Sequence, residues 1–416
     1  MLKAPFRILF WLLLSFGPTT WLRAEVVFEP SPVWRQARLV SPGQQVWSFE
    51  SSLQSYDSRF NELGAPQPLG QPYGRAVTWG QLVQAELSME GRAEIREYMR
   101  RSSLRDSDVA ATAKYQVQRQ EVAMNVRWAY GLTKRWMIGF QLPLVLRRTA
   151  IAQTVEMQPA LSQVQSSLPH TQLVNGNMGV KVRELARAEL SNSGYDEIPS
   201  QAQRWDWGDI SLIGQFIMAE GPRWTWALQE TLRLPTARNA SLADYIQTNS
   251  DEGQFDVAVS SLVDFRHRRW VFSQKVGYVS QMSDQIRLRS PSSDGHGLGA
   301  THSVRRDLGD YFWGSLQCEF KVNSRLALNT EYSFLSKETD RYGDLSQLGH
   351  GYDQLGEGSN QEVHLTRLGL SYRLGERSAR SGVENKWLLA VAYNMPLAGR
   401  NSIEASRASL EMTKYF

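Results

Sequence analysis

Apolar and polar residues alternate strictly along most of the chain. From residue 121 to residue 130, large apolar side chains occupy every even position, while glutamate, alanine, asparagine and arginine occupy the odd ones. After a short connection at 131–135, the same pattern resumes at Trp136. A period of two over this length predicts a long strand with one apolar face. The pattern recurs and predicts strands near residues 44–56, 119–131, 135–147, 206–218, 223–235, 253–265, 270–280, 310–322, 325–336, 362–374, 386–397 and 404–416.

The length and polarity of these strands favour a membrane barrel over a soluble sandwich. Sandwich strands are usually about five or six residues long, whereas about ten residues suit a tilted crossing of a bilayer. The apolar face carries aromatic residues near strand ends, among them Trp128, Trp136, Trp224, Trp270 and Trp387, as interfacial girdles do. The opposite face is polar enough to line a water-filled lumen. We therefore predict an all-β fold, a transmembrane antiparallel up-and-down barrel of about twelve strands with long extracellular loops.

The connections alternate between short and long, as in outer-membrane barrels. Short turns at 131–135, 219–223, 266–269 and 323–325 alternate with long polar stretches at 149–204, 236–252, 282–309 and 337–360. An even strand number would place both termini in the periplasm.

Residues 57–118 leave two alternatives open. In one, residues 79–101 form a helix within a loop. In the other, residues 75–87 and 109–118 form an additional hairpin, which would make fourteen strands.

The N-terminus predicts export. Lys3 and Arg7 precede an apolar run at 8–16, and residues 1–24 together resemble a cleaved signal peptide. Its removal would take away three basic residues and no acid, and would lower the formal net charge of +4 to about +1. A nearly neutral mature chain gives no support for a nucleic-acid partner.

The exported part divides into an irregular segment at 25–43, which either plugs the lumen or stays in the periplasm, and a barrel at 44–416. The last strand ends at Phe416, and such a terminal strand resembles the signal that the barrel-assembly machinery recognises. We expect the bacterial outer membrane as the location, with lipid and lipopolysaccharide around the barrel.

Several turn motifs carry a family resemblance. They are Tyr130 to Trp136 (YGLTKRW), Gly139 to Pro143 (GFQLP), Trp207 to Ile210 (WGDI), Leu232 to Thr236 (LRLPT) and Phe320 to Leu326 (FKVNSRL). Over roughly residues 120–400 the chain resembles outer-membrane barrels of the "meta-pathway of phenol degradation" type, transporters distantly akin to the long-chain fatty-acid channels. Ala237 stands where that family commonly has glycine. The resemblance implies transport of a small hydrophobic or aromatic solute.

The sequence gives little support for catalysis. Its one cysteine, Cys318, lies on the apolar face, where a thiol is inert. His296 and His302, near Asp294 and Asp307, lack the spacing of a metal site. We predict neither a metal, nor a cofactor, nor an enzymatic activity.

The polar inward face holds the candidate site. Its charges are of mixed sign, so no selectivity ring of one sign is indicated. The charges either pair across strands and brace the interior or line a narrow polar path. The candidates for lining the lumen are Asn125, Arg127, Gln229, Arg233, Asp256, Lys275, Glu319, Glu331, Arg367 and Arg407.

Glu230 departs from the alternation, because it falls between Leu228 and Leu232 on the lipid side. An outward acid at mid-depth is unfavourable by on the order of one to three kcal/mol. We therefore expect a β-bulge that turns this side chain inward.

Three functions compete. The first is a channel for passive uptake of a small hydrophobic or aromatic solute. The second is a surface protein without transport activity that binds a partner through the long loops at 149–204 and 337–360. The third is an outer-membrane hydrolase.

Overall fold

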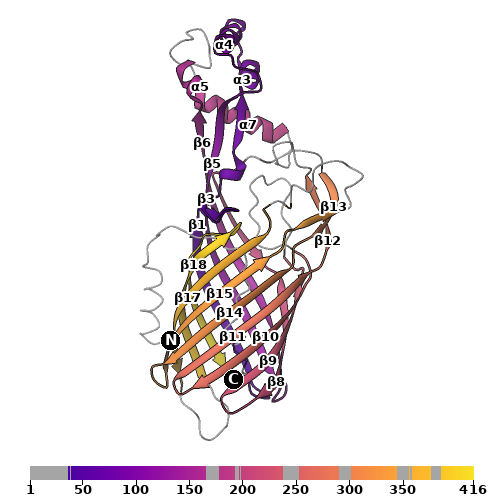
Figure 1. The fold of residues 1–416 in the computed structure, drawn as a ribbon, viewed down its shortest axis with the longest axis vertical. Helices are drawn as coiled ribbons and strands as arrows, with labels where there is room; N and C mark the ends of the chain where they lie inside the picture. The colour runs from indigo at the N-terminus through magenta and orange to yellow at the C-terminus, as the bar shows by residue number, and fades with distance from the viewer. Residues whose placement is uncertain are drawn as a thin grey trace, which may run out of the picture.

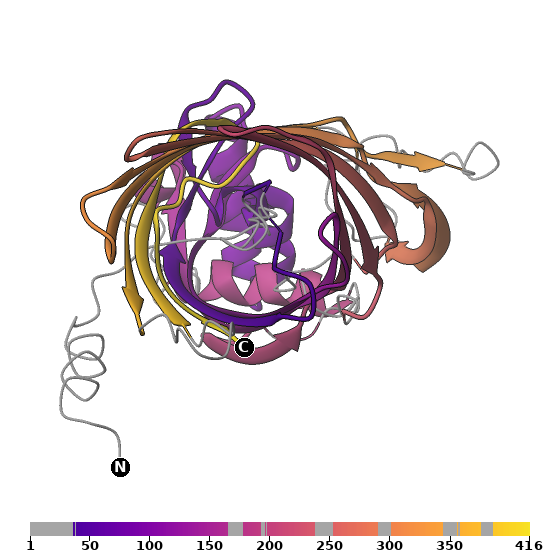
Figure 2. The same ribbon diagram turned by 90° about the horizontal axis from the view of Figure 1, so that it is seen from below.

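The fold is a closed antiparallel β-barrel that carries a small helical head at one end (Figure 1). The structure, a computed structural model, describes residues 36–37, 39–164, 178–192, 196, 198–237, 253–289, 301–343, 356, 358–375 and 386–416. The predicted signal peptide and most of the segment at 25–43 lie outside this part of the chain. Seen along its axis, the barrel is a continuous ring of strands (Figure 2).

Twelve strands close the barrel, because β5 pairs with both β1 and β6 and thereby joins the two ends of the sheet. The predicted twelve strands and the all-β class are confirmed. The barrel strands are β1 (Gln45–Tyr56), β5 (Val109–Gly131), β6 (Trp136–Met157), β8 (Ile210–Glu220), β9 (Trp224–Leu234), β10 (Asp256–His267), β11 (Trp270–Gln281), β14 (Tyr311–Lys321), β15 (Leu326–Lys337), β17 (Gln361–Leu374), β18 (Lys386–Arg400) and β19 (Arg407–Tyr415).

Every barrel strand pairs with its neighbours in sequence, and β1 pairs with β19. The strands therefore alternate in direction, and the short turns gather at the end opposite the head (Figure 1). The alternation of the sequence appears as alternation of burial. In β9, Trp224, Trp226 and Leu232 are exposed on the outer wall, while Thr225 and Gln229 are buried toward the lumen. A closed barrel with an apolar outer wall leaves no unpaired sheet edge in lipid.

The head is built on two strands that are longer than predicted. β5 and β6 have 23 and 22 residues and continue above the other strands as a paired ribbon. Two further strands pair with this ribbon, β4 (Arg75–Thr78) and β7 (Gln201–Trp207). The fourteen-strand alternative is therefore wrong for the barrel, because β4 and β7 extend the sheet without entering the closed ring.

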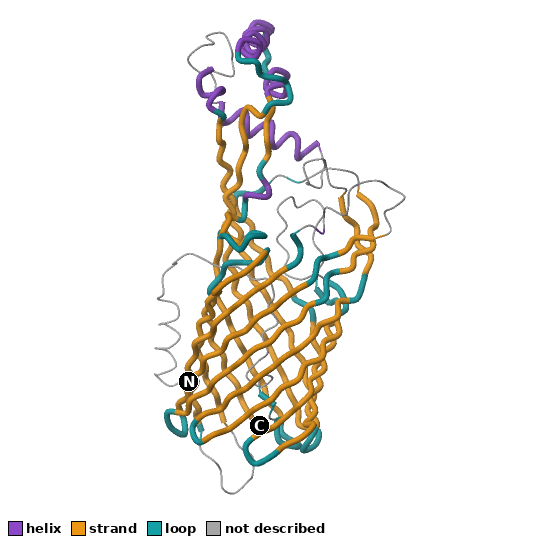
Figure 3. The backbone as a smooth tube through the Cα atoms, in the orientation of Figure 1, coloured by secondary structure: helices purple, strands orange, loops and turns teal. Residues whose placement is uncertain are grey.

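Helices cover the ribbon in the head and appear as the purple segments in Figure 3. They are α3 (Trp79–Ala85), α4 (Met89–Arg101), α5 (Pro159–Val164) and α7 (Met178–Asn192), with the short 3-10 turn η1 (Gln71–Tyr73) nearby. Thr78 and Ser88 cap α3 and α4 through their side chains. The expected helix at 79–101 is thus two helices, and part of the predicted loop at 149–204 is strand and helix.

The head has its own hydrophobic core. Trp79, Leu82, Ile95 and Met99 from α3 and α4 pack with Val182 and with the alanines of the ribbon. Among the described residues, no helix is long and apolar enough to span a membrane.

Two small sheets complete the described elements. β12 (Asp284–Arg289), β13 (Thr301–Asp307) and β16 (Arg341–Gly343) form a three-stranded sheet, and β2 (Ser58–Phe60) pairs with β3 (Pro66–Pro68). They lie at the same end of the barrel as the head (Figure 1). The stretches at 282–309 and 337–360, expected as loops, therefore contain short strands.

Candidate functional site: the lumen

One side of the lumen is braced by buried ion pairs. Arg127 on β5 lies 2.6 Å from Glu50 on β1, and both side chains are 2% exposed. Arg127 also donates to Gln141 on β6 at 3.1 Å. Near the head, Glu121 pairs with Arg147 and accepts from Gln54 at 2.9 Å. These bonds join β1, β5 and β6 across the inner face.

The same bracing continues onto the last strand and onto β9, β10 and β11. Ser48 donates to Glu411 on β19 at 2.5 Å. Between β9 and β10, Arg233 and Asp256 form an ion pair at 2.9 Å. Lys275 donates to Gln229 at 2.8 Å, and its ammonium lies 4.9 Å from the ring centroid of Trp313.

Four described residues of the N-terminal segment, Gln36, Ala37, Leu39 and Val40, contact the inner wall of the barrel. The side-chain amide of Gln215 on β8 donates to the backbone carbonyls of Gln36 and Ala37, at 3.1 and 3.2 Å. Ala37 is fully buried and packs against Ala227 and Leu262. Gln36, Ala37, Leu39 and Val40 are called the plug below, while residues 25–35, on which the two alternatives for this segment depend, lie outside the described part of the chain.

The plug fills only part of the lumen. A cavity of about 310 Å³ lies between the N-terminal segment, at Gln36, Leu39, Val40, Ser41 and Gln44, and the inner wall of β14, β15, β17 and β18. Small residues create the space, because the inward positions of β17 and β18 there are Gly369, Ser371, Ala390 and Ala392. Leu39, Leu388 and Tyr415 add apolar or aromatic lining, and Glu319, Glu331, Arg367, Arg373 and Lys386 add charge.

The predicted lumen residues divide between these two environments. Arg127, Gln229, Arg233, Asp256 and Lys275 take part in the bracing contacts. Asn125 lies beside them and accepts from Gln141 at 3.5 Å. Glu319, Glu331 and Arg367 line the cavity. Arg407 begins β19 opposite Asn394 and is half-buried.

Glu230 does not follow the prediction. Its register with Gly214 on β8 and Val259 on β10 is regular, and its side chain is exposed on the outer wall. The nearest register shift lies between Ile217 and Ala219. The expected bulge at Glu230 is therefore absent, because pairing on both sides fixes the strand in its ordinary pleat.

Sequence reasoning left out several bracing residues. Glu50, Ser48 and Gln54 are inward positions of β1. Their alternation with the outward Trp47 and Phe49 would have predicted this direction. Arg147 follows from the alternation of β6 in the same way. The plug contacts of Gln36 and Ala37 had no such signal, because the segment has no regular period.

Two of the turn motifs meet at the rim of the barrel. The backbone N–H of Ala237 donates to Asp209 at 2.8 Å, and that of Ile210 donates to the hydroxyl of Thr236 at 2.9 Å. The Thr236 hydroxyl in turn donates to the carbonyl of Gly208 at 3.2 Å. WGDI and LRLPT are thus one structural unit that ties the start of β8 to the end of β9.

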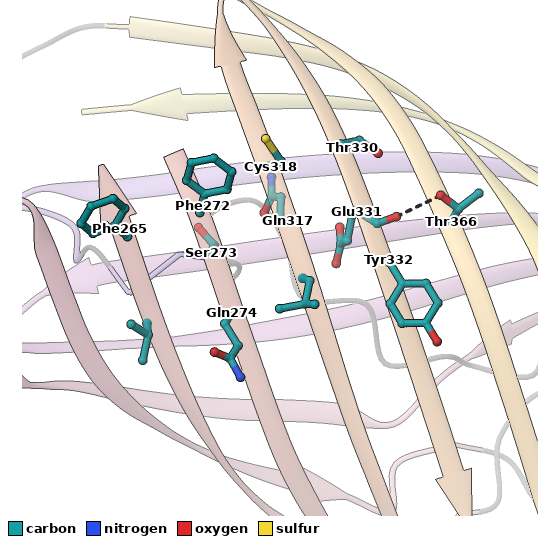
Figure 4. A pocket seen from close by; sticks show the side chains of 12 residues that line it. Phe265, Phe272, Ser273, Gln274, Gln317, Cys318, Thr330, Glu331, Tyr332 and Thr366 are labelled. Carbon is teal, nitrogen blue, oxygen red and sulfur yellow. Dashed lines mark hydrogen bonds between the residues drawn. The ribbon is translucent and has the colours of Figure 1, made fainter. Parts of the chain in front are cut away.

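The outer wall carries a groove of about 460 Å³ (Figure 4). Phe265, Phe272 and Tyr332 border it, and Cys318 and Thr330 lie between them. Gln317, Thr330 and Glu331 line both this groove and the lumenal cavity. The described residues contain no cluster of metal ligands; His296 and Asp294 lie outside them.

A solved structure supports the fold, and two others align more weakly. The COG4313 outer membrane channel from Pseudomonas putida F1 aligns with a TM-score of 0.52 and 11% identity, over 93% of this chain and 99% of that chain. The toluene transporter TbuX from Ralstonia pickettii aligns with a TM-score of 0.35 and 10% identity, over 91% and 90%. The translocator domain of the autotransporter NalP from Neisseria meningitidis gives 0.34 and 8%, over 91% and 89%.

The last two similarities have TM-scores below 0.5 and carry no argument about fold or function. No protein-family model matches the sequence, and no curated protein is significantly similar to it. The barrel that the family resemblance implied is nevertheless confirmed. The chain has the fold of a bacterial outer-membrane channel, and its apolar outer wall locates it in the outer membrane.

Proposed function

We propose that this protein is an outer-membrane channel for passive uptake of a small hydrophobic or aromatic solute. The observation that carries the proposal is the lumenal cavity between the plug and the wall of β14 to β18. The solved structure with the same fold is described as a channel, which supports transport rather than catalysis.

The size and lining of the cavity support a solute of this class. Its volume of about 310 Å³ is about twice that of an engineered cavity, of about 150 Å³, that binds benzene. It is also at the small end of the range of about 300 to 1,000 Å³ for ligand pockets. Leu39, Leu388 and the two alanines offer contact to an apolar body, while Arg367 and Glu319 offer polar contacts to a substituent.

Filling the cavity tests the proposal. Ala390→Trp and Ala392→Trp place an indole into the cavity from the inner wall. Tyr393→Trp is the matched control, because Tyr393 follows Ala392 on β18, is exposed on the outer wall and does not border the cavity. Solute flux into proteoliposomes is measured for a series of single-ring aromatic solutes and for sugars of similar mass.

We expect flux of the aromatic solutes through the native protein and the Tyr393→Trp variant, and near-background flux through the two alanine variants. Native protein that admits no solute of either kind would overturn transport. Equal flux through all four proteins would overturn the assignment of the path to this cavity.

The head supports a second candidate, binding of a partner at the cell surface. It has a core of its own, which a simple loop would not need. Replacing residues 87–104, which carry α4, by a glycine–serine linker distinguishes the two functions. Lost attachment of cells to a surface or host matrix with unchanged solute flux would favour the second candidate.

A further inference from the structure

The outer wall is apolar on one half of the barrel and interrupted by polar side chains on the other. On β5, β6 and β18 the outward positions within the strands include Met124, Ile138 and Val391, all exposed to the membrane. Ser51 on β1 is a polar exception. On the half formed by β9 to β17, a polar belt crosses the wall, and its members are Glu230, Ser261, Gln274, Cys318, Thr330 and Thr366.

The members of the polar belt form a continuous band across neighbouring strands. Cys318 lies opposite Thr330 in the register of β14 and β15. Gln274 lies opposite Leu316, which precedes Cys318 on the same face. Glu230 lies opposite Val259, the outward neighbour of Ser261 on β10. Each member lies three or more residues from both ends of its strand and therefore at the depth of the hydrocarbon.

Two members have polar groups that the barrel itself leaves unused. The side chains of Glu230 and Gln274 are exposed and make no hydrogen bond with any described residue. By contrast, Ser261 accepts from the indole N–H of Trp226 at 3.0 Å, and Thr366 donates to the backbone carbonyl of Glu331 at 3.3 Å. An acid and an amide in hydrocarbon need partners that lipid chains cannot supply.

We propose that the polar belt is an interface within the membrane between two copies of this chain. A partner must present hydrogen-bonding groups at the same depth. A second copy of the chain presents such groups, because two copies inserted in the same direction carry their polar belts at the same depth. The belt is also complementary to itself, since the Gln274 amide of one copy can donate to the Glu230 carboxylate of the other across a two-fold axis.

The groove on the outer wall supports this interface. It lies directly beside the belt and includes Gln274, Cys318, Thr330 and Thr366 among its lining residues. Its aromatic border, Phe265, Phe272 and Tyr332, leaves a recess that an apolar side chain of the partner wall can enter (Figure 4). Polar contacts beside a recess that an apolar side chain fills are typical of a specific protein–protein interface rather than of a wall that faces only lipid.

The test compares the number of copies in membrane patches extracted with an amphipathic polymer. Glu230→Leu combined with Gln274→Leu makes the belt apolar. Ser51→Ala is the matched control, because it removes an outward hydroxyl from the other half of the wall. Light scattering gives the mass of the particles, and the shift in gel mobility on heating shows that the barrels are folded.

We expect two copies per particle for the native protein and for Ser51→Ala, and one copy for the double variant. Native particles with one copy would overturn the proposal, including the case in which the groove retains a co-purified phospholipid. Two copies of the double variant would also overturn it.

Discussion

The two sides of the lumen wall differ in how they use their inward positions. On β1, β5 and β6 these positions carry large charged side chains, as in the buried pair of Glu50 and Arg127. On β17 and β18, glycine, serine and alanine such as Gly369 and Ala390 stand between the charged inward residues, and a cavity remains. One side is closed by mutual pairing, and the other is kept open by small residues.

This difference indicates that the paired side determines the stability of the barrel and that the cavity side determines which solute fits. Paired charges in a protein interior are sensitive to the loss of one partner, because the remaining charge is left without compensation. Small residues beside a cavity contribute little packing, so changes there affect what fits rather than whether the barrel holds. Variants on the two sides should therefore have opposite effects on unfolding and on flux.

The largest expected effect is on the paired side. Arg127→Met keeps the approximate side-chain volume but leaves the Glu50 carboxylate buried, and we expect a loss of about 3 to 5 kcal/mol of unfolding free energy. Urea unfolding in lipid vesicles, followed by tryptophan fluorescence, measures it. Glu50→Leu added to Arg127→Met should restore most of the loss. A double variant as unstable as the single one would contradict the account.

A smaller effect is expected where the plug is attached. Gln215→Ala removes the two hydrogen bonds to Gln36 and Ala37, and at about 0.5 to 1.5 kcal/mol each we expect a loss of about 1 to 3 kcal/mol. Gln215→Glu is the sharper variant, because an ionised carboxylate cannot donate to a carbonyl. Both variants should raise the ion conductance of single barrels in planar bilayers. Unchanged conductance in both would show that the plug is held by other contacts.

The barrel could be predicted because its strands follow one rule, in which side chains that face lipid alternate with side chains that face the lumen. That rule gave the twelve strands and the direction of Arg127 and Lys275. The head could not be predicted in the same way. In the ribbon, Ala110, Ala111 and Ala113 are all buried, because helices cover a face that would be exposed in the barrel. Local alternation is lost there, and β5 continues beyond the predicted start.

The site was predictable only in part. Alternation identified Glu331 and Arg367 as inward, but it cannot show that they line a cavity, because the space depends on small residues of β17 and β18 and on where the plug lies. Glu230 shows the opposite limit. The prediction assumed that an outward acid must be turned inward, whereas regular pairing keeps it on the outer wall.

On the open side we expect a small effect on stability and a clear one on transport. The Glu331 carboxylate lines the cavity, and Glu331→Gln keeps its shape, so the change in unfolding free energy should stay within about 0.5 kcal/mol. Loss of one negative charge should shift flux toward anionic solutes, which a comparison of benzoate with benzyl alcohol measures. A destabilisation equal to that of Arg127→Met would remove the distinction between the two sides.

The smallest effect is expected for an ion cluster outside the lumen. Glu97 on α4 pairs with Arg100 and Arg101 at 2.7 and 2.8 Å; the two arginines are exposed to solvent and Glu97 is partly exposed. Hydrogen bonds from these arginines lower the pKa of Glu97 from 4.5 to about 2. A lowered pKa means that the pairing stabilises the head above pH 4.5 and that this contribution is lost as the pH falls toward 2. Because solvent screens such pairs, Glu97→Gln should leave barrel unfolding unchanged and should only slightly speed hydrogen exchange of the α4 amides. The difference in exchange rate from the native protein should be constant above pH 5 and should shrink below it. A difference that grew as the pH fell would show that Glu97 acts through something other than its two arginines.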